Sequence, residues 1–414
     1  MLSSSPPRAS RRSSATLGGL GWFYLLGGVL VLWVAWPTAP EAVSTLRFAR
    51  LGSLMLSTRW CMILCAALFL VTGMLCYSAR PRSRVHRVSL GTNALALVCL
   101  VLVWASTGRR LEVLGILAQS VRLATPIALG ALAGILCERS GVVNIAIEGM
   151  MLSAACLGFM IALYAANAWV GVLAAVAAGG TMAALHAILS IQWRVEQIIS
   201  GIVINMLAVG LTGFIRRTVL LHNVREAPAV LPTWTLPVIS DLPVLRQLCG
   251  RHQPLVYAML LLVLLVHILL FYTRWGLRTR AVGEHPRAAD TVGIHVCTVR
   301  YANVILGGMI AGVGGAWFSL ETVGNFEDLM TNGKGFIALA AMIFGKWNPL
   351  GALGGALLFG FADALQIKLQ IAGVNVPYQI LGMLPYLVTM IVLAGVIGRA
   401  LPPAASGIPY DKGS

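Results

Sequence analysis

The sequence predicts an all-α integral membrane protein with about ten to twelve transmembrane helices. Of its 414 residues, 58% are hydrophobic and only 11% are charged, whereas soluble domains carry about 25% charged residues. A bilayer removes the need for a polar surface, because lipid solvates apolar side chains. The 44 glycines fit this class, since small residues let membrane helices pack closely.

Eleven segments are apolar over about 20 residues, the length that spans the hydrocarbon core as a helix. They are residues 17–36, 60–78, 88–106, 113–137, 148–166, 168–192, 195–215, 255–273, 301–321, 349–369 and 378–399. A further apolar piece, Gly335–Gly345, has only about half of that length.

Residues 17–36 also have a secretory signal peptide as an alternative interpretation, because Arg8, Arg11 and Arg12 precede them. The apolar run is longer than a signal core and no small-x-small cleavage site follows it, so we expect a retained span. Residues 1–16 are rich in Ser and Pro and are expected to form a disordered cytoplasmic N-terminus.

The net charge of +16 comes mostly from arginines in short runs between apolar segments, as in Arg80–Arg87. Such runs are typical of topology signals and contacts with anionic lipid, and they argue against nucleic-acid binding. If the N-terminus is cytoplasmic, alternation makes the loop 274–300 cytoplasmic and the long segment 216–254 external. The basic residues are then in excess on the cytoplasmic side, as expected.

Two interruptions divide the apolar pattern, at Glu138–Gly149 and at Asn332–Ala341. Each places glycine and a polar group before a small-residue apolar run, G-x-x-N-I-A in the first and G-K-G-F-I-A in the second. Broken helices at matching places in two halves of a transporter indicate a central substrate path. We therefore expect broken or re-entrant segments near 140–149 and 333–346; plain loops before well-packed helices are the alternative.

Polar residues inside spans are costly and often functional, which makes Arg122, Asn144, Glu148 and Asn205 candidates for the translocation path. Asn144 and Glu148 are four residues apart and share a face if that segment is helical. The alternative is that Arg122 and Glu148 pair with each other or with the backbone.

Small residues also recur at helix-packing spacing. For the patterns Gly308-x-x-x-Gly312 and Gly351-x-x-x-Gly355, packing between helices is the preferred interpretation.

No pattern typical of an enzyme occurs in the chain. A phosphate loop is missing, because Gly333-Lys334-Gly335 lacks the spaced glycine and the hydroxyl residue. H-E-x-x-H and G-x-S-x-G are missing too, and the seven histidines are scattered. The eight cysteines form no C-x-x-C pair and are interpreted as buried hydrophobes. We expect no catalytic residue, metal or cofactor.

The basic loop Arg274–Arg300 carries start and stop signals for a short helix. Pro286 suits the first helical position and Gly293 the end, with the small Ala288 and Ala289 between them. So short a helix has no propensity to stand alone. We therefore expect a docking partner that contacts the small side chains; an ordinary basic loop is the alternative.

Three stretches together, Glu138–Met151, Gly276–Ile294 and Gly333–Pro349, resemble one family. This family comprises the permease subunits of ATP-binding-cassette (ABC) importers for branched-chain amino acids, simple sugars and nucleosides, and the motifs are closest to the nucleoside-type members. The resemblance covers roughly Val113 to Val396. It implies a permease core at 113–400 and a C-terminal tail at 401–414, after an N-terminal extension of three helices at 17–112 that short members lack.

The resemblance also implies that the loop forms the coupling helix that docks on a cytoplasmic ATPase. The residues so assigned are Gly283, Glu284, His285, Pro286, Arg287, Ala288, Ala289, Asp290 and Gly293. His285 departs from the family pattern, in which Asn is usual.

The implied partners are a cytoplasmic ABC ATPase, a second permease subunit (identical or paralogous) and an extracytoplasmic solute-binding lipoprotein. The implied location of this chain is the inner membrane. The implied function is uptake of a small polar solute, with a purine or pyrimidine nucleoside favoured and riboflavin or a simple sugar as alternatives. An ion-coupled secondary transporter that uses Glu148 and Asp363 as proton-exchanging carboxylates is an alternative from another class.

Overall fold

The computed structural model describes residues 13–47, 52–78, 84–108, 110–222, 230–235, 243–248, 250–371, 379, 382–383 and 400–412. The expected span at 378–399 lies almost wholly outside these residues. The described chain forms two compact units. One contains the described residues up to Gly115 with the end of the last long helix, and the other contains Ile116–Gln366 with the described C-terminal residues.

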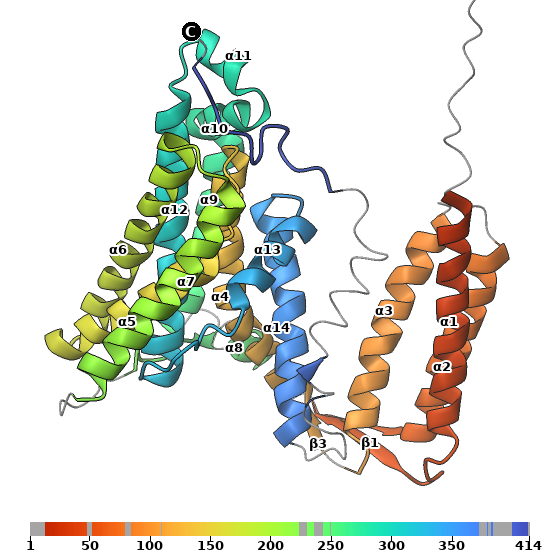
Figure 1. Ribbon diagram of the computed structural model, residues 1–414. Coiled ribbons are helices and arrows are strands. Elements are labelled where there is room, and N and C mark those ends of the chain that lie inside the picture. Colours follow the sequence, from red (N-terminus) through yellow and green to blue (C-terminus); the bar gives the residue numbers. More distant parts are fainter. Residues whose placement is uncertain are drawn as a thin grey trace, which may run out of the picture. The chain divides into compact units, whose positions relative to one another are not determined.

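The first unit consists of three apolar helices and a small sheet (Figure 1). Its elements are α1 (Ser13–Ala35), β1 (Val43–Arg47), β2 (Ser53–Ser57), α2 (Thr58–Ser78), α3 (Arg84–Ala105) and β3 (Arg110–Glu112). Strand β1 is central, antiparallel to β2 and parallel to β3. Helix α2 is long and apolar enough to cross a membrane and confirms the expected span 60–78, whereas α1 and α3 contain only the shorter apolar segments Gly21–Ala35 and Gly91–Trp104. Hydropathy did not predict the strands between the helices.

Small and polar side chains hold these helices together. A Cβ added at Gly28 of α1 would lie 2.8 Å from the Leu70 side chain and 3.1 Å from the Ala66 carbonyl oxygen of α2, so glycine at this position lets the two helices approach closely. Between α2 and α3, the Asn93 amide donates to the Thr72 hydroxyl (2.8 Å). Such hydrogen bonds stabilise helix pairs in a membrane, where water does not compete.

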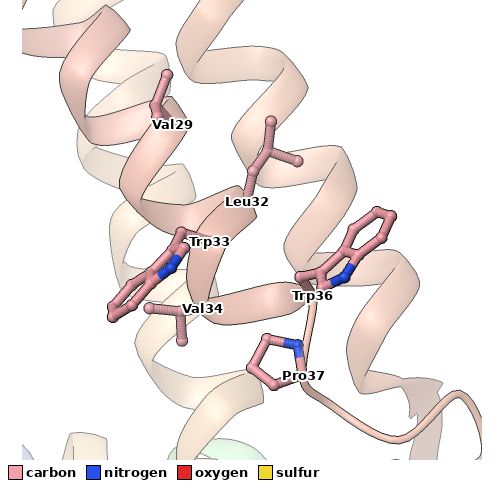
Figure 2. A pocket seen from close by; sticks show the side chains of 6 residues that line it. All are labelled: Val29, Leu32, Trp33, Val34, Trp36 and Pro37. Atoms are coloured by element: carbon pink, nitrogen blue, oxygen red, sulfur yellow. The ribbon is translucent and has the colours of Figure 1, made fainter.

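The end of α1 carries two exposed tryptophans around a shallow apolar hollow (Figure 2). Trp33 and Trp36 are 75% and 79% exposed, and Val29, Leu32, Val34 and Pro37 complete the lining. Tryptophan is enriched where membrane meets water. This end of α1 therefore has the composition of a membrane-interface anchor.

The second unit contains the longest helices. Its elements are α4 (Val113–Arg139), α5 (Ile147–Ala165), α6 (Ala168–Ala187), the π-helical turn η2 (Ile188–Gln192), α7 (Gln197–Ile215), the π-helical turn η3 (Arg216–Leu220), β4 (Trp234–Thr235), α8 (Pro243–Leu248), β5 (Arg251–His252), α9 (Pro254–Tyr272), α10 (Arg274–Glu284), α11 (Pro286–Thr291), α12 (Val296–Ala316), the π-helical turn η5 (Trp317–Val323), α13 (Lys334–Phe344) and α14 (Pro349–Ile371). Among the described residues of the whole chain, eight helices are long and apolar enough to cross a membrane.

Helices α6 and α12 lie side by side (Figure 1) and approach closely because their contact is made of glycine and alanine. A Cβ added at Gly308 would lie 2.5 Å from the Gly179 carbonyl oxygen, and one at Gly312 would lie 2.4 Å from that of Ala175. The predicted packing role of this glycine pair is confirmed. The Gly351/Gly355 pair likewise faces backbone, at Gly345 and Ala341.

The second interruption completes a crossing of the unit. Residues 324–333 are non-helical and follow η5 in the chain. The turn η5 contacts the start of α9. Helix α13 then continues to the far end, where the Trp347 indole donates to Glu138 at the end of α4 (2.6 Å). The half-length apolar piece is thus the helical half of a broken crossing, as the expectation of broken segments near 140–149 and 333–346 requires.

Candidate functional site

The two interrupted crossings meet at the side chain of Glu148, in the first turn of α5. Its Oε1 accepts hydrogen bonds from the Thr331 hydroxyl (2.6 Å) and the Gly333 N–H (2.8 Å), and its Oε2 accepts one from the Gly335 N–H (2.6 Å). The first amides of a helix have no partner within it, and a carboxylate favours that positive end. Glu148 therefore caps α13 and ties it to α5.

Glycines allow the two helix starts to touch. A Cβ added at Gly335 would lie 2.6 Å from the Glu148 Cα. Asn205 of α7 holds the other side of the break, because its Oδ1 accepts from the Gly149 N–H (2.8 Å) and its Nδ2 donates to the Ile145 carbonyl (3.0 Å). The structure thus brings together Glu148 and Asn205, two of the four candidates, around the start of α5.

Asn144 has a local role in the same break. Its side chain is fully buried, and its Oδ1 accepts from the Ala146 N–H (3.0 Å). Asparagine commonly stabilises a turn in this way, by accepting a hydrogen bond from the N–H two residues further along the chain. Because α5 begins only at Ile147, Asn144 does not share a helical face with Glu148.

Arg122 lies apart from these three residues. Its charge acts on Glu321 of η5 without forming an ion pair with it, whereas Glu148 is bound to Thr331 and to backbone amides. Sequence reasoning missed Glu321 and its neighbour Gln253. Glu321 ends an apolar span, where a single acid looks like an ordinary helix terminus, and no spacing connects it with Gln253.

The acids needed by an ion-coupled mechanism are both engaged in the structure. Glu148 accepts three hydrogen bonds, and Asp363 of α14 forms an ion pair with Lys334 at the start of α13. The side chains of this pair are 20% exposed for Lys334 and 11% for Asp363. These contacts favour structural roles for both carboxylates.

The expected short helix is present as α11, at one end of the unit with α10 (Figure 1). Pro286 occupies its first turn, and Gly293 follows it with a φ of +85°, a conformation that favours glycine. The start and stop signals are therefore confirmed. The role of α11 as a coupling helix remains a prediction.

The two alanines of α11 differ in exposure. Ala289 is only 4% exposed and packs with Val282, Val296 and Val299 inside this chain. Ala288 is exposed, and Val292 just beyond the helix is 74% exposed. The expectation that both alanines contact a partner needs correction, because Ala289 fixes α11 to its own chain.

Gly283 is also an internal contact. A Cβ there would lie 2.2 Å from the Arg139 carbonyl oxygen at the end of α4, so the end of α10 rests on the end of α4. Of the other residues assigned to the coupling helix, Glu284, His285 and Arg287 are exposed, and Asp290 is half-buried.

Residues 400–412, which we term the C-terminal strap, cross this end of the unit. The Ala405 N–H donates to the Gly283 carbonyl (2.9 Å), and the Gly407 N–H donates to that of Gly141 (3.3 Å). Asp411 forms an ion pair with Arg194 (2.8 Å). A groove of about 460 Å³ separates the strap from η2 and the start of α12. The sequence predicted a tail here but not these contacts.

Arg300 of α12 anchors the strap from inside. It is 1% exposed, and it donates to the carbonyls of Ser140 (3.2 Å) and Ile408 (3.1 Å). Buried charges are retained where hydrogen bonds compensate for lost solvent. Arg300 thus connects α12, the first interruption and the strap.

Among the described residues, no group of three or more His, Cys, Asp or Glu side chains could hold a metal ion.

The chain is similar to known transport proteins. Residues 116–396 match the family model described as "Branched-chain amino acid transport system / permease component". The guanosine ABC transporter permease protein NupQ of Bacillus subtilis is 41% identical over 302 residues, which cover 70% of this chain and 94% of the relative. The nucleoside ABC transporter permease protein NupC of Lactococcus lactis is 37% identical over 306 residues, or 72% and 96% of the two chains.

A third relative, a putative glucose ABC transporter permease protein of Haloferax volcanii, is 36% identical over 69% of this chain and 92% of its own. No solved structure matches the chain.

Proposed function

Because the chain belongs to the permease component family of branched-chain amino acid transport systems, we propose that it forms the membrane path of an ABC importer for nucleosides. It is an ABC transporter permease and a multi-pass membrane protein. The choice of solute rests on two relatives. One, 41% identical, is named for guanosine, and the other, 37% identical, is named for nucleosides. This chain spans more than nine tenths of each.

ATP hydrolysis on a separate cytoplasmic subunit drives the uptake. The outer face of α11, with Ala288, Thr291 and Val292 exposed, is the surface that the ATPase contacts. Its inner face is already bound to the permease through Ala289. A helix fixed on one side and free on the other can receive a push from the ATPase and pass it inward. In this arrangement the N-terminus and α11 are cytoplasmic, and the protein lies in the inner membrane.

A second, paralogous permease completes the path. Bacillus subtilis has two proteins named as guanosine ABC transporter permeases, NupQ and NupP, and this chain is 41% and 26% identical to them. Such a pair in one organism supports a heterodimeric permease here. A solute-binding lipoprotein on the external side delivers the nucleoside.

A sugar is the second candidate solute, since the Haloferax volcanii relative is named for glucose. The test is uptake of radiolabelled guanosine and glucose into cells that express the permeases, the ATPase and the lipoprotein. We expect guanosine uptake that unlabelled nucleosides suppress and that stops when the ATPase is inactivated by mutation. Uptake of glucose alone, or guanosine uptake that survives the inactive ATPase, would overturn the proposal.

A further inference from the structure

Three polar side chains gather at the end of the second unit that lies opposite α10 and α11. Gln253 directly precedes α9, Glu321 lies in η5, and Arg122 lies in α4. Helix α9 has 19 residues, so about 28 Å separate this cluster from α10. In the proposed importer, this end faces the side from which solute arrives.

Two hydrogen bonds define the geometry of the cluster. Glu321 is fully buried, and its Oε2 accepts a hydrogen bond from the Leu255 N–H (2.7 Å) at the start of α9. The Gln253 Nε2 donates to the Glu321 carbonyl (2.6 Å). This contact fixes which way the Gln253 amide points, because an atom facing a carbonyl oxygen must be the NH₂ group.

Each side chain then has one acceptor left over. Glu321 Oε1 and Gln253 Oε1 are both buried, and neither has a hydrogen-bond partner in the part of the chain that the structure describes. A buried acceptor without a donor is costly, and more so when it is charged. Capping α9 uses only Oε2 of Glu321, so a structural role does not account for the other two oxygens.

The cluster is carried by an unusual backbone. Glu321 lies in η5, a π-helical turn that ends α12, and such turns occur frequently at functional sites. Trp317, nearly one turn earlier, is 4% exposed and has an indole N–H without a partner among the described residues. Its ring meets that of Phe318 edge to face, with centroids 5.0 Å apart.

We propose that Glu321 Oε1 and Gln253 Oε1 form an acceptor pair that receives hydrogen bonds from hydroxyl or amino groups of the transported solute. The identity of the solute rests on the function proposed above, but the need for donors does not, since sugars and nucleosides both carry hydroxyls. The site is a transient one, because a permease must release what it binds.

The test compares uptake of guanosine with that of three analogues that each lack one donor: 2′-deoxyguanosine, 3′-deoxyguanosine and inosine. Rates are measured at saturating solute in the complete transporter with Glu321→Gln, which keeps an oxygen to cap α9 but places an NH₂ group at the acceptor position. Gln253→Leu removes the second acceptor. Glu327→Gln is the matched control, because this exposed carboxylate lies six residues further along.

The readout is the ratio of the guanosine rate to the analogue rate, which is independent of the amount of protein. For one analogue at least, we expect the ratio to fall about tenfold in Glu321→Gln relative to wild type, or about 1.4 kcal/mol, and to be unchanged in Glu327→Gln. Ratios that stay at the wild-type value in both Glu321→Gln and Gln253→Leu would overturn the proposal, even if the absolute rates fall.

The two proposals fail in different ways. If the wild-type transporter takes up glucose and no nucleoside, the proposed solute is wrong, and the same ratios measured with deoxyglucoses decide the acceptor pair. If it takes up neither, both proposals are overturned.

Discussion

Because Ala288 is exposed and Ala289 is buried, the same substitution at each position tests which side of α11 faces its own chain. In Ala289→Asp the new carboxylate enters a cluster of Val282, Val296 and Val299. Neutralising an aspartate of ordinary pKa at pH 7 costs about 4 kcal/mol, and the added volume costs about 1–3 kcal/mol more. A six-residue helix held mainly by this cluster cannot absorb such a loss, so α11 should detach. Ala288→Asp changes an exposed position, where substitutions alter folding by about 0.5 kcal/mol or less.

The assay combines limited proteolysis of the loop with co-purification of the ATPase. For Ala289→Asp we expect faster cleavage near Arg287 and loss of the ATPase. For Ala288→Asp we expect wild-type resistance to protease together with weakened ATPase recovery, because the charge falls on the docking face. Equal protease resistance in the two variants would refute the assignment of inner and outer faces.

Three further predictions follow from the contacts described. Single cysteines at Val230 and Arg287 in a cysteine-free chain should be labelled by impermeant reagents from opposite sides of the membrane; labelling from one side would contradict the topology. Glu148→Ala should lower thermal stability by about 3 kcal/mol or more, since three hydrogen bonds to a carboxylate are lost, and Glu148→Gln should be intermediate; wild-type stability of the alanine variant would exclude the capping role. Asp411→Asn should cost under about 1 kcal/mol, as for an exposed ion pair, whereas Arg300→Met should release the C-terminal strap to protease; strap release only in Asp411→Asn would show that Arg300 is not its anchor.

Hydropathy predicted the long helices because a bilayer imposes their length. The expected span 148–166 appears as α5 (Ile147–Ala165), and the expected span 349–369 as α14 (Pro349–Ile371). The interruptions were predictable because glycine and polar residues break an apolar run. Local signals also placed the start of α11 at Pro286.

Contacts between distant parts of the chain could not be predicted in this way. The partners of Glu148 lie more than 180 residues away, so its capping of α13 has no local signature. The orientation of Ala289 depends on valines from α10 and α12, and six helical residues are too few for a periodic pattern. Gln253 and Glu321 meet across 68 residues through a π-helical turn that composition does not reveal.

Gly283, at the end of α10 just before α11, connects this end of the unit with the broken crossings. Gly283 rests on the carbonyl of Arg139, and the Arg139 Nε donates to the Trp347 carbonyl (3.0 Å) just beyond α13. The opposite end of α13 is capped by Glu148. Close-packed interiors transmit displacement, and in two of these contacts the side chains of Arg139 and Glu148 bind backbone groups of the next segment. If the ATPase pushes on α11, as we propose, these backbone and side-chain contacts lead from that end of the unit to Glu148, where α5 and α13 meet.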